Sequence, residues 1–221
     1  MTGPGAHWEA VWRRRPPETV SWYEAEPARS LAIIESVAAD RAAAIVDVGG
    51  GASLLVDRLL DAGYRDLTVL DVSGAAIERA RARVGRRARA ATVCWVVGDA
   101  TDWRPDRRFE VWHDRAVFHF LVDGADRRRY VAALRSALRP SGHAVLATFG
   151  PDGPTTCSGL PTRRYSAAGL AAELGDGFVL QHAELAVHVT PTGAEQQFQW
   201  AVFQRVLEEQ TTGEAGLAGP P

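Results

Sequence analysis

The sequence lacks lysine altogether and has only two cysteines in 221 residues. Two cysteines cannot form a disulfide framework or a cysteine-rich zinc cluster. Cys94 also lies in an apolar segment that predicts a buried strand. We therefore expect a protein of the reducing cytoplasm without a metal site. The missing lysine, beside 25 arginines and abundant alanine, fits a GC-rich coding bias and indicates no function.

An excess of charge and a long apolar run are also missing. The formal net charge is −2, which gives no basis for a nucleic-acid or membrane surface. No apolar run reaches eighteen residues, and the first residues do not resemble a signal peptide. With 46% hydrophobic residues, a chain of this length predicts one domain with an ample core.

A glycine turn lies between two apolar segments near residue 50. Residues 44–48 predict a strand, Gly49 to Gly51 a tight turn, and residues 53–62 a helix, as at the start of a Rossmann-like sheet. A second strand over 67–71 ends in Asp71, an acid placed to accept hydrogen bonds from ribose hydroxyls. Two cofactor classes fit this pattern: a nicotinamide or flavin dinucleotide, and S-adenosylmethionine.

The composition of the turn distinguishes the two classes. A dinucleotide site needs a small residue three positions beyond Gly51, where this chain has Leu54. Small residues lie instead at Gly49, Gly51 and Ser53, and Asp47 precedes the first glycine by two positions. This arrangement resembles motif I of the class I S-adenosylmethionine-dependent methyltransferases, whose ligand carries a methionine group rather than phosphates.

Later segments continue the resemblance in the same order. Residues 91–97 predict a third strand followed by Asp99 and Ala100, which by resemblance contact the adenine amino group and the adenine ring. Residues 109–115 and 142–149 predict the fourth and fifth strands, and residues 138–142 resemble the turn of this family into its fifth strand. The expected helices span 27–39, 53–62, 74–84, 124–138 and 166–174.

The fold class that follows is α/β, a Rossmann-like methyltransferase sheet with helices on both faces. It is mostly parallel, and the alternating runs 178–189 and 197–206 predict a C-terminal antiparallel strand pair. We expect residues 1–43 to form an N-terminal lid and first helix, residues 44–207 the methyltransferase domain, and residues 208–221 a disordered tail.

The lead-in over residues 6–26 is rich in tryptophan and proline and is expected to be loop-like. It resembles the beginning of a small bacterial subgroup of these methyltransferases, in which Ser21, Trp22 and Tyr23 form a Ser-Trp-Tyr motif. Trp12, Trp22 and Tyr23 have two interpretations. They form either a hydrophobic cap over the sheet or a lid whose aromatic faces lie near the sulfonium or the acceptor.

The fourth strand delivers Asp114, Arg115 and His119 to the edge where open parallel sheets bind ligands. As catalytic candidates, Asp114 orients the cofactor or the acceptor, and His119 accepts a proton or hydrogen-bonds the substrate. The structural alternative for His119 is a buried, satisfied histidine. The expected cofactor contacts are Trp12, Trp22, Tyr23, Asp47, Gly49, Gly51, Asp71, Val72, Asp99, Ala100, Asp114 and Arg115.

The polar loop over 151–165 follows the fifth strand and is the candidate for substrate specificity. It contains Cys157, which contacts a soft acceptor or only packs in the loop. It also contains Arg163, which pairs with a substrate carboxylate or is a solvated surface arginine, and Tyr165 as a third candidate for substrate binding.

The function that these features predict is methyl transfer from S-adenosylmethionine to an oxygen, nitrogen or sulfur atom of a small molecule. The expected partners are that substrate, without nucleic acid or membrane, in a monomer or homodimer. Two alternatives remain open: a protein (lysine) methyltransferase, and a non-catalytic regulatory or assembly protein that binds the cofactor.

Overall fold

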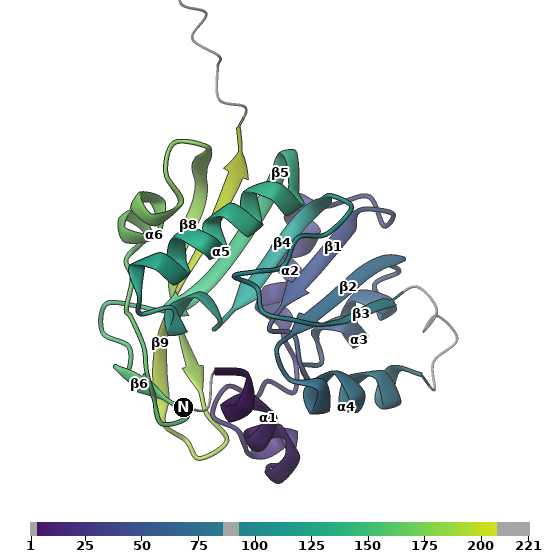
Figure 1. The fold of residues 1–221 in the computed structure, drawn as a ribbon, viewed down its shortest axis with the longest axis vertical. Coiled ribbons are helices and arrows are strands. Elements are labelled where there is room, and N and C mark those ends of the chain that lie inside the picture. The colour runs from purple at the N-terminus through teal and green to yellow at the C-terminus, as the bar shows by residue number, and fades with distance from the viewer. Residues whose placement is uncertain (1–3, 86–92, 207–221) are drawn as a thin grey trace, which may run out of the picture.

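A computed structural model describes residues 4–85 and 93–206, which form a seven-stranded sheet with helices on both faces (Figure 1). The strands are β1 Ala44–Val48, β2 Asp66–Asp71, β3 Val93–Val97, β4 Phe109–Arg115, β5 Leu138–Phe149, β8 Phe178–Val189 and β9 Glu195–Arg205. Their order across the sheet is β3-β2-β1-β4-β5-β9-β8. β1 to β5 are parallel, and β9 is antiparallel to both β5 and β8. The predicted fold class is confirmed.

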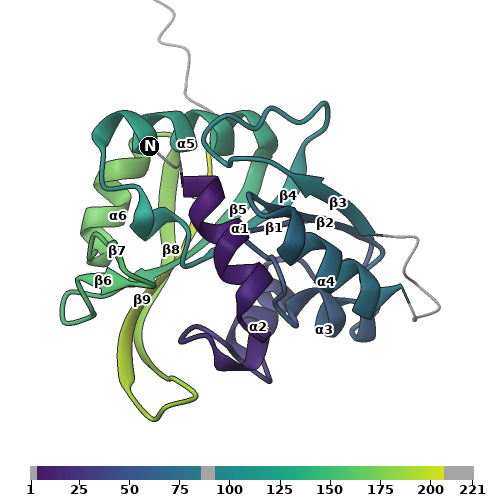
Figure 2. The same cartoon turned by 60° about the horizontal axis from the view of Figure 1, so that its bottom comes forward.

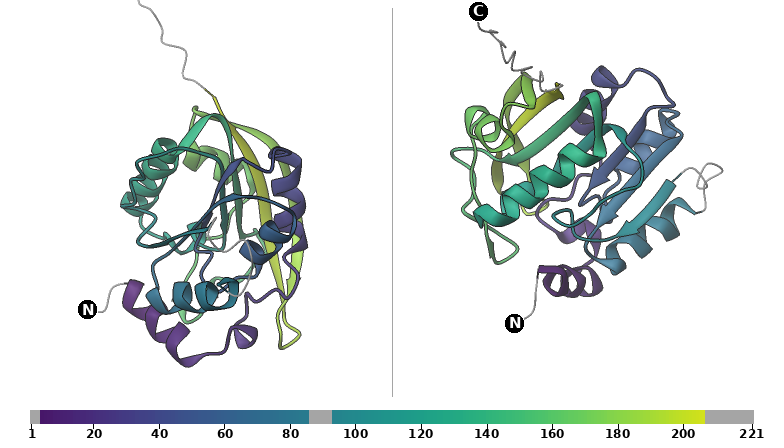
Figure 3. Two further views of the ribbon diagram at one scale, coloured as in Figure 1. Left: turned by 90° about the vertical axis from the view of Figure 1, so that its right-hand side faces the viewer. Right: turned by 45° about the horizontal axis from the view of Figure 1, so that its top comes forward.

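Two helical layers bury the two faces of the sheet (Figure 3). One layer contains α2 (Ala28–Val37), α3 (Leu55–Asp61) and α4 (Gly74–Val84), and the other contains α5 (Gly124–Ala137) and α6 (Ala167–Leu174). Alternation along β1 sends Ile45 to the core with Leu55, and Val46 to the core with Leu134. All five predicted helices are present, with ends shifted by at most two residues. None of the helices in the described residues is long and apolar enough to cross a membrane.

Two connections differ from the prediction. β5 begins at Leu138, not at 142, because the expected turn pairs with β4 through Leu138 and Phe109 before a register shift. The loop expected over 151–165 contains a short hairpin, β6 (Thr156–Cys157) and β7 (Leu160–Pro161). Residues 91–92 of the predicted third strand and the predicted tail 208–221 lie outside the described residues.

The expectation of a loop-like lead-in was wrong for its first part. Residues Pro4–Arg14 form α1, and the short 3-10 turn η1 (Pro17–Thr19) follows. Trp8 and Trp12 are four residues apart, so they share one helical face, while Arg13 Nε donates to Glu9 Oε1 at 2.7 Å on the surface. Figure 2 shows α1 lying beside α4 across the carboxyl ends of the central strands.

The glycine turn between β1 and α3 needs glycine for steric reasons. Gly49 has φ +67°, and a Cβ there would lie 2.1 Å from Val117 Cγ2. Gly51 has φ +42°, and a Cβ there would lie 2.6 Å from Asp71 Oδ2. Side chains at these positions would therefore push the turn away from the ends of β2 and β4.

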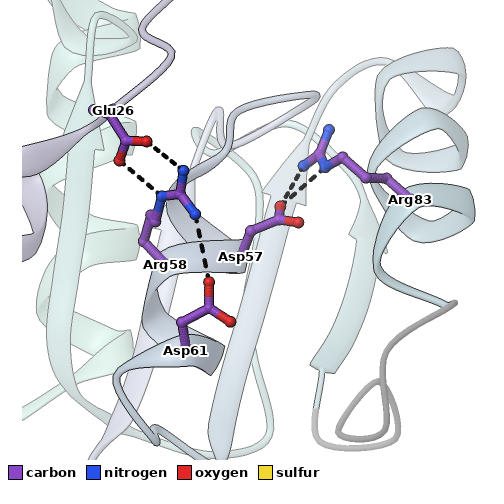
Figure 4. A network of polar contacts seen from close by, with 5 residues as sticks. All are labelled: Glu26, Asp57, Arg58, Asp61 and Arg83. Carbon is purple, nitrogen blue, oxygen red and sulfur yellow. Dashed lines mark hydrogen bonds and ion pairs between the residues drawn. The ribbon is translucent and has the colours of Figure 1, made fainter.

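Arginine pairs hold the helices around this turn (Figure 4). Arg83 of α4 donates to Asp57 of α3 at 2.7 and 2.9 Å and to the carbonyl oxygen of Ala52 at 3.0 Å. Arg58 of α3 donates through Nε to Glu26 at 2.9 Å, just before α2. These contacts tie α3 to both neighbouring segments and fix the end of the glycine turn.

Candidate functional site

A cavity of about 470 Å³ lies at the carboxyl ends of β1, β2 and β4, beneath α1 and beside the β6–β7 hairpin. Its size is typical of pockets that enclose small ligands or cofactors. Ten residues predicted from the sequence line it: Trp12, Trp22, Gly49, Asp71, Val72, Asp99, Ala100, Arg115, His119 and Cys157. Six others do not line it: Tyr23, Asp47, Gly51, Asp114, Arg163 and Tyr165.

Asp47 lies behind the glycine turn. Its Oδ1 is 2.7 Å from His113 Nδ1, and His113 Nε2 is 3.0 Å from Ser30 Oγ in α2. A Cβ on Gly50 would lie 2.5 Å from Asp47 Oδ2, so this carboxylate is covered by the turn. With Tyr23, Asp47 borders a smaller neighbouring cavity of about 50 Å³. The contacts described for Asp47 therefore support the glycine turn from the side away from the large cavity.

Asp71 reaches the large cavity from the end of β2. It is only 7% exposed, and its Oδ1 accepts a hydrogen bond from the Ser73 N–H at 2.8 Å. Burial, followed by the charges of Asp47 and Glu9, raises the pKa of Asp71 to about 7. A ligand that donates hydrogen bonds to this carboxylate would favour its charged form.

Asp99 and Ala100 line the cavity in the turn after β3. Asp99 Oδ1 accepts hydrogen bonds from the N–H and the hydroxyl of Thr101, both at 2.8 Å. Ala100 is 8% exposed and packs in the core beside Val48. The carboxylate of Asp99 is exposed while its backbone is held by the turn, so it faces the cavity from a fixed position.

The segment before α2 is held over the sheet by two basic side chains. Arg115 Nη1 donates to the carbonyl oxygen of Trp22 at 2.8 Å, and Nη2 lies 3.0 Å from Glu24 Oε1. Burial lowers the pKa of Arg115, which the Glu24 charge opposes. His188 Nε2 donates to the carbonyl oxygen of Ser21 at 2.8 Å. The charge of Arg115 is thus balanced by Glu24, which belongs to the segment that Arg115 holds.

Aromatic rings close the cavity from the α1 side. Trp8 contacts Trp22 and Phe120 edge to face, with ring centroids 5.5 and 5.0 Å apart. Trp12 contacts Trp22 in the same way at 5.9 Å. Trp8 and Phe120, which the sequence analysis did not select, line the cavity beside Trp12 and Trp22. The Trp8–Trp12 spacing of four residues was the signal for a helix that presents both rings to one side.

Glu9, also missed, fastens α1 to α4. Its Oε2 accepts hydrogen bonds from Ser73 Oγ at 2.8 Å and from the Ala75 N–H at 3.0 Å, at the beginning of α4. The Ala75 N–H and then Arg13 lower the pKa of Glu9 to about 2. A carboxylate at a helix N-terminus is stabilised by the unpaired N–H groups there.

Asp114 is completely buried and shapes the loop after β4 from within. It accepts hydrogen bonds from the Val117 N–H at 2.8 Å, the Phe118 N–H at 3.1 Å and the Tyr130 hydroxyl. Burial raises its pKa to about 6. Ala116 within this loop has φ +75°, a strained conformation for a residue with a Cβ. Asp114 therefore positions the residues of this loop that line the cavity.

His119 lies in the 3-10 turn η3 (Phe118–Phe120) and faces the cavity. Its Nδ1 accepts a hydrogen bond from the Phe149 N–H at 3.1 Å, so its proton is on Nε2. Nε2 is buried and has no partner among the described residues. Burial and the charge of Arg115 lower the pKa of His119 to about 3. His119 is therefore a neutral hydrogen-bond donor, which does not suit the role of proton acceptor.

The three residues predicted to bind the substrate lie in different surroundings. Cys157 lines the cavity, and burial raises the pKa of its thiol, so the thiol stays protonated. Arg163 lies outside the cavity, half-exposed, with Nη2 3.4 Å from Glu173 Oε1. Tyr165 is buried against Phe118, and burial raises its pKa to about 12. Of the three, only Cys157 contacts the space where a ligand fits.

Among the described residues, no group of three or more His, Cys, Asp or Glu side chains is arranged to hold a metal ion. The side chains that line the cavity offer a buried acid, aromatic walls and the neutral donor His119.

Comparison with known proteins identifies the central segment. Residues 45–142 match the family model described as methyltransferase domain. Nodulation protein S of Rhizobium tropici is 31% identical over 116 residues, which are 52% of this chain and 47% of the relative. The match thus spans about half the length of that relative.

Solved structures agree with the fold. One from work on the conversion of a disulfide bond into a thioacetal group during echinomycin biosynthesis has a TM-score of 0.70 and 24% identity, covering 90% of this chain and 91% of that chain. The 1,6-didemethyltoxoflavin-N1-methyltransferase of Burkholderia thailandensis was solved with its substrate and S-adenosylhomocysteine. It has a TM-score of 0.67 and 20% identity over 83% of this chain and 80% of its own.

Proposed function

We propose that this chain, in which residues 45–142 form a methyltransferase domain of the class I fold, transfers the methyl group of S-adenosylmethionine to a small molecule. The observation that carries the proposal is the cavity at the strand ends, where the glycine turn, Asp71 and Asp99 line one continuous space. The bound cofactor supplies an electrophilic methyl group on a sulfonium, and the acceptor gives up a proton if its nucleophilic atom carries one.

Asp71, Asp99 and the glycine turn would hold the cofactor. Asp71 offers a buried carboxylate to the two ribose hydroxyls, and Asp99 offers an exposed one to the adenine amino group. Gly49 lines the cavity, and both Gly49 and Gly51 keep the turn close to the strand ends, because a Cβ at either would collide with a neighbouring side chain there. We expect Val72 and Ala100 to pack against the adenosine.

The part of the N-terminal segment that precedes α2 would act as the lid, within the expected division of residues 1–43 into a lid and a first helix. Trp8 and Trp12 each contact Trp22 edge to face above the cavity, so the three rings exclude water from it. Electron-rich ring faces also attract a sulfonium cation. This supports placing the chain with the subgroup whose members begin with a Ser-Trp-Tyr motif.

A small acceptor fits better than a protein acceptor. The space is enclosed by α1, the loop after β4 and the β6–β7 hairpin, and aromatic side chains form much of its wall. The Burkholderia relative in fold acts on a small heterocycle, and its similarity supports this choice. Alignment of acceptor, methyl carbon and sulfur is the main task of such a site.

The test combines binding and turnover. The full chain is titrated with S-adenosylmethionine in a calorimeter, then incubated with it and separate sets of thiols, phenols, amines, heterocycles and peptides. Formation of S-adenosylhomocysteine is measured by mass spectrometry. We expect turnover with a small molecule. Turnover with peptides alone would indicate a protein methyltransferase, and binding without turnover on any set would indicate a regulatory protein.

A further inference from the structure

Four residues that line the cavity have a buried polar atom without a hydrogen-bond partner among the described residues: His7 (Nε2), Arg115 (Nη2), His119 (Nε2) and Gln196 (Oε1). Arg115 Nη2 lies 3.0 Å from Glu24 Oε1, so its charge has a partner. His119 and Gln196 are opposite in hydrogen-bonding character. His119 Nε2 carries a proton to donate, and Gln196 Oε1 is an acceptor. Neither has a hydrogen-bond partner among the residues that the structure describes, and both residues line the cavity. Native proteins leave few buried polar atoms unpaired, so such atoms indicate where a ligand binds.

His119 is held rigidly from three sides. The carbonyl oxygen of its backbone accepts a hydrogen bond from the Arg163 N–H at 2.8 Å, and its Nδ1 accepts one from Phe149. Its ring lies over the ring of Phe149, with centroids 4.4 Å apart, and contacts Phe120 edge to face at 4.5 Å. Because Nδ1 is already used, the ring cannot exchange its two nitrogens without losing a buried hydrogen bond.

Gln196 reaches the same wall from β9, a distant part of the sequence. Phe198, two residues further along β9, shares its strand face and also lines the cavity. Phe198 pairs with Phe149 across β5 and β9, with ring centroids 5.0 Å apart. The ring of His119 is 6.3 Å from that of Phe198. The donor, the acceptor and the aromatic rings thus belong to one surface.

We propose that this surface is the acceptor subsite, and that it selects uncharged planar molecules in which a hydrogen-bond acceptor and an N–H or O–H donor meet His119 Nε2–H and Gln196 Oε1. The assignment rests on the proposed function. His119 and Gln196 are positioning residues here, and His119 removes no proton from the acceptor.

The charges around the surface exclude charged acceptors. The guanidinium of Arg115 lies 5.2 Å from the centre of the Phe198 ring, and Glu24 balances its charge. Arg129, which also lines the cavity, pairs with Asp126 at 2.9 Å. A carboxylate would therefore be desolvated without a free counter-charge. A primary ammonium would meet the donor of His119 and could not accept its hydrogen bond. A planar uncharged ring packs against Phe149 and Phe198 and satisfies both polar atoms.

Three probes of nearly equal shape test the proposal by binding alone. 2-Quinolone carries a carbonyl beside an N–H, 1-methyl-2-quinolone lacks the N–H, and quinoline lacks both groups. Each is titrated by calorimetry into the full chain saturated with S-adenosylhomocysteine. We expect 2-quinolone to bind about ten-fold or more tightly than either of the others, since one lost hydrogen bond to a buried group costs on that order.

Two variants locate the effect. His119→Phe keeps a ring but removes both the Nε2 donor and the acceptor of the Phe149 N–H. Gln196→Leu keeps the size and removes only the amide, at a position less buried than His119, so it is the cleaner variant. Each should weaken 2-quinolone binding about ten-fold and reduce the preference over quinoline, while S-adenosylhomocysteine affinity stays within about two-fold. His182→Phe and Gln181→Leu, exposed on β8 outside the cavity, are the matched controls and should bind as the original chain does.

Each outcome bears on the proposal. If 2-quinolone binds no better than quinoline, or if Gln196→Leu keeps the original preference while S-adenosylhomocysteine still binds, the acceptor subsite is wrong and the proposed function stands. Preference for quinoline-2-carboxylate over 2-quinolone would likewise overturn it. Failure of the original chain to bind S-adenosylhomocysteine would overturn the proposed function and this subsite together.

Discussion

The protonation of Asp71 leads to a quantitative prediction for cofactor binding. In the free protein, burial and the nearby charges of Asp47 and Glu9 raise the pKa of Asp71 to about 7. Ribose hydroxyls donate to a carboxylate and stabilise its charged form, so the cofactor should bind the deprotonated protein in preference. Cofactor affinity should therefore fall as the pH is lowered below 7.

The size of the effect follows from the fraction of protein that is deprotonated. With a pKa of about 7, roughly one molecule in eleven is charged at pH 6, so the Kd should be about ten-fold higher at pH 6 than at pH 8.5. Lowering the pH by one further unit, from 6 to 5, should raise the Kd by up to about another factor of ten. The same link means that one proton is released when the cofactor binds near pH 6.

The assay is calorimetric titration of S-adenosylhomocysteine from pH 5.5 to 8.5, in two buffers of different ionisation enthalpy to count the released protons. Asp71→Asn should bind about ten-fold more weakly at pH 8.5, through loss of a charge-assisted hydrogen bond, and lose the pH dependence. Asp66→Asn, at the half-buried beginning of the same strand and outside the cavity, is the matched control and should retain it. A Kd independent of pH in the original chain would refute the reasoning.

The stability of the free protein should show the opposite dependence on pH. The pKa of Asp71 is raised on folding, so the folded chain holds this proton more tightly than the unfolded chain does. This contribution is complete below about pH 4 and is lost as the pH rises through about 7. The difference in Tm between the original chain and Asp71→Asn should change accordingly over this range, and saturating cofactor should reverse the trend.

Three further predictions concern the framework of the site. Gly49→Ala combines a clash with Val117 and a positive φ, so it should lower the free energy of unfolding by about 3 kcal/mol in urea, whereas Gly193→Ala, which has a positive φ but open space around it, should cost only about 1 kcal/mol. Glu9→Gln should lower stability at pH 7 by about 1 kcal/mol and weaken cofactor binding. Because the pKa of Glu9 is lowered on folding, the difference should vanish as the pH falls from about 4.5 to 2. Asp114→Asn should lower the Tm, since an amide cannot accept all three hydrogen bonds, and an unchanged Tm would contradict its role in the loop.

Local patterns predicted the elements of the fold and the wall of the cavity that contains Gly49, Asp71 and Asp99. The glycine turn, Asp71 and Asp99 each follow an apolar strand directly, and parallel strands bring such ends to one edge. α1 was missed although Trp8 and Trp12 have helical spacing, because the prolines after it favoured a loop interpretation. The helix is also short, so few residues are available to establish a periodic pattern.

The wall of the cavity around His119 and Gln196 could not be predicted from the sequence because distant segments build it. Gln196 and Phe198 reach the cavity because β9 inserts between β5 and β8, and nothing local in their sequence indicates that neighbour. The tautomer of His119 depends on the Phe149 N–H, which only the folded chain brings within 3.1 Å. Periodicity therefore indicates which residues face inward, but not which polar atoms remain unpaired there.

Asp71 and Asp114 show why a perturbed pKa does not identify a functional residue by itself. Both acids lie at strand ends, and burial raises the pKa of both. Asp114 accepts three hydrogen bonds within the protein, from two backbone N–H groups and from Tyr130, and it has no contact with the cavity. Asp71 lines the cavity, and its described hydrogen bond uses only Oδ1. A ligand can therefore change the protonation of Asp71 directly, whereas it reaches Asp114 only by moving the loop that Asp114 holds.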